Sequence, residues 1–262
     1  MYEPFSVRSF RFQWPADLMA SWAFEMETII LGWYVLTITD SVLVLTIFAS
    51  MQWLGTLIAP YLGVLGDRWG RRTMLCLLRA SYLITSIITM SLALTDTLNA
   101  SIILGISFVI GLVRPSDLVM RNGLIGDTML GNVLMKAMGV SRTTMDSARI
   151  AGALVGAGLF SSLGIGYAYV AVTIFYAISL LLTFGVSSVK TITCRKNDTI
   201  NRSPLMDLKD GLRYVWRTPT LLAAMWFAFL VNLTVFPVSH GILPFVAKEI
   251  YNIEVGKENR RS

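Results

Sequence analysis

Long apolar stretches, separated by short polar segments, run along most of this chain. Seven of them reach about 20 residues, the length that an α-helix needs to cross the hydrocarbon core of a bilayer. Only helices and closed barrels satisfy their backbone in lipid, and these stretches are too long for barrel strands. The pattern therefore predicts an all-α, polytopic membrane protein. The predicted spans are residues 16–38, 42–65, 73–94, 100–121, 142–163, 166–189 and 221–245.

The charged residues indicate which side of the membrane each connection lies on. Only 15% of residues are charged, against about 25% in soluble domains. The basic residues concentrate in alternate connections, whereas those at residues 39–41, 95–99 and 164–166 contain none. By the positive-inside rule, the N-terminus is cytoplasmic and the net charge of +6 reflects topology, with no nucleic-acid partner. The basic residues expected inside are Arg8, Arg11, Arg68, Arg71, Arg72, Arg114, Arg121, Lys136, Arg142, Lys190, Arg195, Lys196, Arg202, Lys209, Arg213 and Arg217.

Other classes of function find little support in the residues. The chain contains no H-E-x-x-H or G-x-S-x-G motif and no glycine-rich phosphate loop opening a helix, which argues against an enzyme. Cys76 and Cys194 both fall on the predicted cytoplasmic side, where thiols stay reduced. We therefore expect no disulfide. Because His240 is the one histidine, we also expect no metal site and no cofactor.

The polar and apolar segments divide the chain into three parts. Residues 1–189 form a lobe of six transmembrane helices. Residues 190–220 form a hydrophilic cytoplasmic linker, in which Leu205–Trp216 has the spacing of an amphipathic helix at the membrane surface. Residues 221–262 contain the seventh span and a polar tail.

A charged, glycine-rich segment, Gly63-Val64-Leu65-Gly66-Asp67-Arg68-Trp69-Gly70-Arg71-Arg72, connects the second and third spans. In its letters (G-x-x-x-D-R-x-G-R-R) and in its position, it resembles the motif of major facilitator superfamily transporters. Six spans, a linker with a surface helix and a seventh span resemble the first half of that fold. Weaker similarities to the bacterial branch that exports siderophores and macrolides lie at residues 31–35 and 211–215, at Phe236-Pro237 and at Leu243-Pro244.

The resemblance implies a function. Such transporters move a small molecule by alternating access between two six-helix lobes in a bacterial-type inner membrane. It further implies proton-coupled efflux, by antiport, of a bulky drug-like or siderophore-like compound. The chain ends where an eighth helix is expected, which suggests a truncated twelve-helix fold. The alternatives are an inactive fragment and a half-transporter that must dimerise.

The same resemblance assigns a conformational latch to the charged segment. It places Asp67 and Arg71 in a charge network between the lobes, with an acidic partner in the fourth span. Asp117 matches that partner best, and Asp127 is the alternative. Glycine allows a tight turn and close backbone approach, and the basic side chains also fix topology. The complete set is Gly63, Asp67, Arg68, Gly70, Arg71 and Asp117.

Two carboxylates in the first span are candidates for proton coupling. Glu25 and Glu27 lie near its middle, where an ionised side chain costs about 2.5–3.5 kcal/mol on insertion scales. Because residues i and i+2 point about 200° apart on a helix, only one of them can face a central cavity. The other is then buried between helices or paired with Arg79 or Arg149. The alternative is that both glutamates are structural hydrogen-bonding groups.

Two arginines lie within predicted spans. Arg149, in the fifth span, is either a partner for a substrate or carboxylate, or extends to the cytoplasmic surface. Arg79 lies closer to the membrane surface in the third span, and we expect it to reach the cytoplasm.

Stripes of small residues mark close helix packing in two spans. Gly152 and Gly156 follow Ala148 in the fifth span, and Gly55, Ala59 and Gly63 are similarly spaced in the second. In the family, both helices line the contact between lobes. The resemblance therefore implies instability, or self-association through an exposed lobe interface.

Overall fold

A computed structural model describes residues 3–52, 54–129, 131–186 and 213–237. These residues belong to two compact units, with the division at residues 204 and 205. The described residues contain helices and no strand, which confirms the all-α prediction. The first unit contains η1 (Glu3–Ser6), α1 (Arg8–Thr39), α2 (Val42–Met51), η2 (Leu54–Leu57), α3 (Ala59–Trp69), α4 (Arg71–Leu94), α5 (Ala100–Thr128) and α6 (Gly131–Phe184). The second contains a helical turn at residues 213–217, followed by α8 (Pro219–Pro237).

Several of these helices are suited to a bilayer. Among the described residues, α4, α5 and α6 are each long and apolar enough to cross a membrane. The bent pair formed by α2 and α3 is a fourth span if it is counted as one. A polytopic membrane fold follows from these lengths.

The second predicted span is broken, which corrects the expectation of one helix over residues 42–65. α2 ends at Met51, α3 begins at Ala59, and the two segments meet at a bend of 45°. Pro60, in the first turn of α3, has no N–H to donate to a preceding carbonyl. At the break, the backbone lies so close to Gly111 of α5 that a side chain at either Gly55 or Gly111 would clash.

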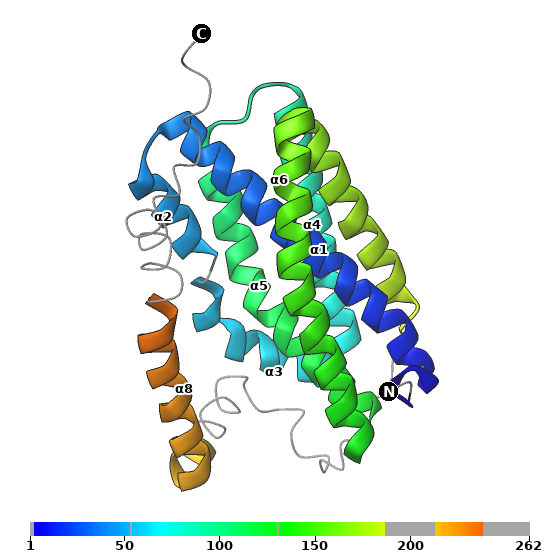
Figure 1. Ribbon diagram of the computed structural model, residues 1–262. Helices are drawn as coiled ribbons and strands as arrows, with labels where there is room; N and C mark the ends of the chain where they lie inside the picture. Colours follow the sequence, from blue (N-terminus) through cyan, green and yellow to red (C-terminus); the bar gives the residue numbers. More distant parts are fainter. Residues whose placement is uncertain (1–2, 53, 130, 187–212, 238–262) are drawn as a thin grey trace. The chain divides into compact units, whose positions relative to one another are not determined.

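The fifth and sixth predicted spans form one element, α6, with two arms. At 54 residues it would extend about 80 Å if straight, far more than a bilayer requires. Gly164 interrupts it with φ 76° and ψ 176°, a conformation that side chains disfavour. Figure 1 shows the chain reversing its direction there. One glycine thus replaces the expected loop.

Helices extend beyond the predicted spans at the opposite end of the bundle. α5 continues to Thr128, so Arg114 and Arg121 lie inside a helix rather than in a cytoplasmic loop. Similarly, α6 begins at Gly131, so it includes Lys136 and Arg142. This corrects the placement of four basic residues in the second inner connection.

The core of the first unit surrounds α1. This helix packs against α2, α5 and both arms of α6, and it runs through the helix bundle in Figure 1. It is buried on several faces because small and apolar residues occupy most of its positions. Its fully or almost fully buried apolar side chains include Ala16, Ala20, Ala23, Met26, Ile30, Leu31 and Val35.

The small-residue stripes pack against other helices of this unit. A Cβ at Gly152 would lie 3.0 Å from the Cβ of Glu25, and one at Gly156 would lie 2.8 Å from the Cα of Met26. Both glycines therefore face α1. Since Gly55 faces α5, neither stripe supports the argument for self-association.

Some predictions lie outside the described residues. These are the roles of Lys190, Arg195, Lys196, Arg202, Lys209, Cys194 and His240, residues 205–212 of the surface helix, residues 238–245 of the seventh span, and the tail that follows it. Cys76 is a free thiol.

Candidate functional site

The charged segment between the second and third predicted spans forms a compact junction at one end of the bundle. Gly70 alone separates α3 from α4, and its φ of 91° suits a residue without a side chain. Across this junction, Arg71 contacts the carboxylate of Asp67 at 2.9 Å, one turn away. Its Nη1 also donates to Asp127 Oδ1 (2.9 Å) and to the Gly123 carbonyl (2.6 Å). One guanidinium therefore joins α3, α4 and α5.

This geometry corrects the preference for Asp117 as the acidic partner. Asp127 contacts Arg71, whereas Asp117 lies in the interior. The reason is depth, because the two residues are ten positions, or about 15 Å, apart along α5. Asp67, Arg71 and Asp127 meet. Gly63 lies a turn before Asp67, and a Cβ there would lie 3.9 Å from Val119 of α5.

We predict that Asp127→Asn destabilises the junction more than Asp67→Asn does. The side chain of Asp127 is 11% exposed and that of Asp67 is 60% exposed, and exposed ion pairs contribute only about 0.2–1 kcal/mol. Thermal unfolding in detergent micelles measures both variants. Equal losses of stability would show that the contact between Arg71 and Asp127 contributes no more than the exposed contact between Arg71 and Asp67.

The N-terminal segment covers the same end of the unit. Lys136 Nζ lies 2.5 Å from Glu3 Oε2, and Trp14 donates to Thr144 Oγ1 at 2.9 Å. The hydrogen bond from Lys136 lowers the pKa of the exposed Glu3 carboxyl. These contacts tie the start of the chain to α6.

A group of four buried charges lies deeper, and we call it the ionic ring: Asp17 of α1, Arg79 of α4, and Asp117 and Arg121 of α5. All four are at most 6% exposed. Arg79 forms a close ion pair with Asp17, and Arg121 Nε lies 2.5 Å from Asp117 Oδ2. The ring has equal numbers of positive and negative groups, so its net charge is zero. Pairing of this kind is what makes buried charge tolerable.

Polar neighbours extend the ring to other helices. Arg79 donates to Thr183 of α6, and Arg121 Nη1 donates to Ser21 Oγ of α1 at 3.0 Å. Gln13 Nε2 donates to the Arg121 carbonyl at 3.1 Å. The expectation that Arg79 reaches the cytoplasm is therefore wrong, because a carboxylate and a hydroxyl within the bundle bind its guanidinium.

Glu27 occupies a second buried polar site, which it forms with the second arm of α6. Tyr169 donates to its Oε1 at 3.0 Å and Tyr176 donates to its Oε2 at 2.7 Å. The side chain is 4% exposed. Among the described residues, its carboxylate forms no ion pair within 4 Å. Two neutral hydroxyls are thus its direct partners.

Glu25 has a different environment, as the i, i+2 spacing predicts. Its Oε1 lies 3.8 Å from Arg149 Nε, a loose pair in which the arginine side chain is 62% exposed. Close by, Arg114 lies over the ring of Phe24 and donates to Gln52 Oε1 at 2.8 Å. The sequence offered Arg149 as a partner for either glutamate, and the structure pairs it with Glu25.

These groups lie at a common depth. Glu25, Arg114 and Arg149 are 14 or 15 residues from Asp40 at the end of α1, Ala100 at the start of α5 and Gly164 at the interruption of α6. That separation is about 21–23 Å along a helix, within a hydrocarbon core of about 30 Å. Charged side chains at such depth face the protein interior or water rather than lipid.

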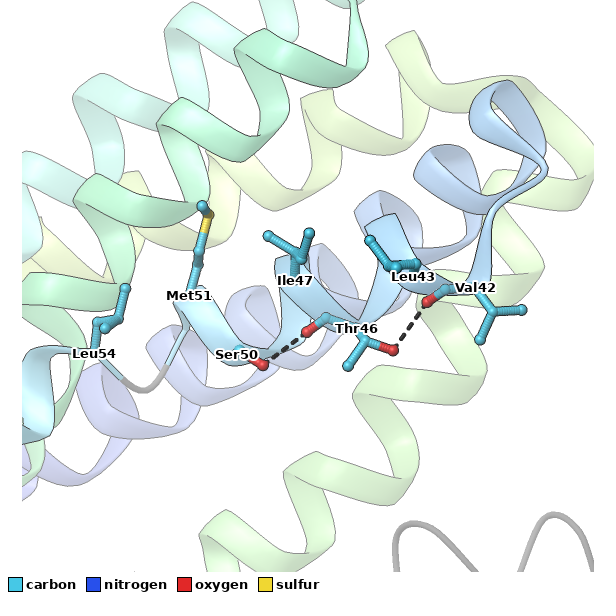
Figure 2. Close-up of a pocket in the computed structure, with 7 residues that line it drawn as sticks. All are labelled: Val42, Leu43, Thr46, Ile47, Ser50, Met51 and Leu54. Atoms are coloured by element: carbon cyan, nitrogen blue, oxygen red, sulfur yellow. Dashed lines mark hydrogen bonds between the residues drawn. The ribbon is translucent and has the colours of Figure 1, made fainter.

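The surface also carries a shallow, open cavity of about 460 Å³ on α2 and η2. Figure 2 shows its seven lining residues, and the hydroxyls of Thr46 and Ser50 among them bond back to carbonyls of their own helix. The wall is therefore almost wholly apolar. Since it contains no charged group, we locate the candidate site at the buried charges instead.

Sequence reasoning missed most of the ionic ring. Asp17 lies near the start of the first predicted span, and Arg121 was counted among the loop cations. The sequence does contain one signal for this site. Asp117 and Arg121 lie four residues apart within an apolar segment, and charged residues in such a segment usually contact polar groups on other helices. Tyr169 and Tyr176 carried no comparable signal.

Comparison with known proteins adds one finding. The model of the family described as Major Facilitator Superfamily matches residues 15–257. No curated protein and no solved structure matches the chain.

Proposed function

Because the chain belongs to the major facilitator superfamily, whose members are transporters, we propose that it exports a bulky, partly apolar compound in exchange for protons. Glu27 is the proton-binding group of this proposal. That the chain is a membrane transporter follows from the family and from the apolar helices.

The observation that carries the proton assignment is the environment of Glu27. Its carboxyl group is almost fully buried, and its direct partners are two tyrosine hydroxyls. A carboxyl in such a site can hold or release a proton without breaking an ion pair. Glu25, by comparison, is partly exposed and lies near an arginine.

A second observation supports a water-filled space on another face of α1, next to Glu25. Arg149 is 62% exposed at a depth where lipid contact would be costly. Its exposed face therefore fits a water-filled space, as alternating access requires. Trp22 and Phe175, whose ring centres are 5.9 Å apart, supply aromatic surface close to Glu25.

The test replaces each glutamate by its neutral isostere. With the full chain in liposomes, we expect Glu27→Gln to abolish efflux of ethidium or a fluorescent macrolide driven by a proton gradient. Glu25→Gln is the matched control and keeps the gradient dependence. If Glu27→Gln retains gradient-driven efflux, Glu27 does not couple protons. If the unmodified chain moves none of these compounds, the proposed substrate class fails.

A further inference from the structure

The ionic ring has an internal geometry that its role in stability does not require. Each carboxylate lies within 4 Å of both guanidinium groups, so the ring has four edges. Two edges are short, Arg79–Asp17 and Arg121–Asp117. Two are long, with Arg79 Nε 3.9 Å from Asp117 Oδ1 and Arg121 Nε 3.6 Å from Asp17 Oδ1.

Two buried polar atoms of the ring face each other across one long edge without a hydrogen bond. These atoms are Arg79 Nε and Asp117 Oδ1, whereas Arg121 Nε is ion-paired with Asp117 Oδ2 at 2.5 Å. Buried donors and acceptors without partners are costly. These two atoms would meet if the long edge between Arg79 and Asp117 became short. The ring is therefore only partly satisfied in the arrangement described.

We propose that the ionic ring is a partner-exchange switch with two arrangements. In the arrangement described, Arg79 binds Asp17 and thereby joins α4 to α1, while Asp117 and Arg121 neutralise each other within α5. In the exchanged arrangement, Arg79 binds Asp117 and Arg121 binds Asp17, so α5 is joined to both α4 and α1. All four charges stay paired in both arrangements. An interior that has two packed states of this kind is a common basis of conformational switching.

In a transporter that works by alternating access, this exchange is a conformational switch within one lobe. That role rests on the proposed function. α1 carries Glu27 ten residues beyond Asp17, and α5 carries Asp127 six residues beyond Arg121. A shift of α5 against α1 would thus reach both the proton site and the junction at Arg71. The four residues act as positioning residues, since none of them touches Glu27 in the structure.

Charge swaps test the switch, because each swap permits a different set of edges. Asp17→Arg/Arg79→Asp keeps opposite charges on the short edges and places like charges on the long ones, which fixes the described arrangement. Arg79→Asp/Asp117→Arg does the reverse and fixes the exchanged arrangement. The quadruple variant Asp17→Arg/Arg79→Asp/Asp117→Arg/Arg121→Asp restores opposite charges on all four edges.

The readout is a distance that needs no transport. Spin labels are attached at Arg8→Cys on α1 and Gly126→Cys on α5, in a background of Cys76→Ser and Cys194→Ser. Arg8 is exposed, and nothing lies within 4 Å of a Cβ at Gly126. Pulsed electron paramagnetic resonance on the full chain in lipid nanodiscs then gives the distribution of label distances.

We expect one distance in each double variant, different between the two, and both distances in the parent chain and the quadruple variant. Equal distances in the two double variants would overturn the switch. So would a failure of Arg79→Asp/Asp117→Arg to fold while the quadruple variant folds, since the exchanged arrangement would then be inaccessible. If the distances behave as expected but the parent chain moves no compound, the proposed function fails and the switch stands.

Discussion

Arg79→Met is expected to lower the free energy of unfolding by about 3–5 kcal/mol, the usual cost of removing one partner from a buried ion pair. Arg79 is 1% exposed and binds both Asp17 and Thr183. Without it, the ion pair that remains to the Asp17 carboxylate within the described part of the chain is the 3.6 Å contact with Arg121. Methionine preserves most of the side-chain volume, so the loss reports charge rather than a cavity. Titration with sodium dodecyl sulfate in mixed micelles, followed by tryptophan fluorescence, measures the change.

Two further variants identify the cause of this loss. Arg142→Met removes an arginine that is 68% exposed and paired one turn away with Asp146, so its expected effect is about 0.3–0.5 kcal/mol. Arg79→Met/Asp17→Leu removes both charges of one edge and should recover part of the stability, because Asp117 and Arg121 neutralise each other. A double variant less stable than Arg79→Met would contradict the electrostatic explanation.

Gly156→Val is expected to disrupt the packing of α6 on α1, at a cost of about 1–3 kcal/mol or more. The added Cβ would lie 2.8 Å from the Cα of Met26 and 3.2 Å from its carbonyl oxygen. Both atoms belong to the backbone, so a change of rotamer cannot relieve the clash, and α1 must move. The same titration measures the loss, and tryptophan emission detects the displacement.

Gly158→Val is the matched control for this prediction. It lies on the same arm of α6, and nothing is within 4 Å of its Cβ position. The same substitution there should leave stability almost unchanged. If the two variants behave alike, helix propensity rather than contact with α1 determines the effect.

The long helices were predictable because apolar length alone specifies them. α4 at Arg71–Leu94 agrees with the predicted span over residues 73–94 to within two residues. The break between α2 and α3 was not predictable in the same way, since it depends on a close approach to Gly111 in another helix. The two arms of α6 were foreseen as separate spans, although the single-residue junction at Gly164 was not.

The site was only partly predictable, for a related physical reason. Hydropathy identifies a charge inside a span but says nothing of its partner, which lies on another helix. Glu25 and Glu27 were therefore found from the sequence, and their opposite orientations followed from the helical period. The pairing of Arg79 with Asp17 joins residues 62 positions apart, and no local pattern encodes it.

The ionic ring also bears on the order in which the chain is made. Synthesis proceeds from the N-terminus, so Asp17 reaches the membrane before Arg79, and Arg79 before Asp117 and Arg121. An arginine in a newly inserted helix costs about 2.5–3.5 kcal/mol if it stays unpaired. When α4 enters the membrane, Asp17 of α1 is already there to pair with Arg79. α5 then enters with Asp117 and Arg121 one turn apart, so these two charges can pair with each other. The sequence order thus limits the time that any of these charges spends in lipid alone.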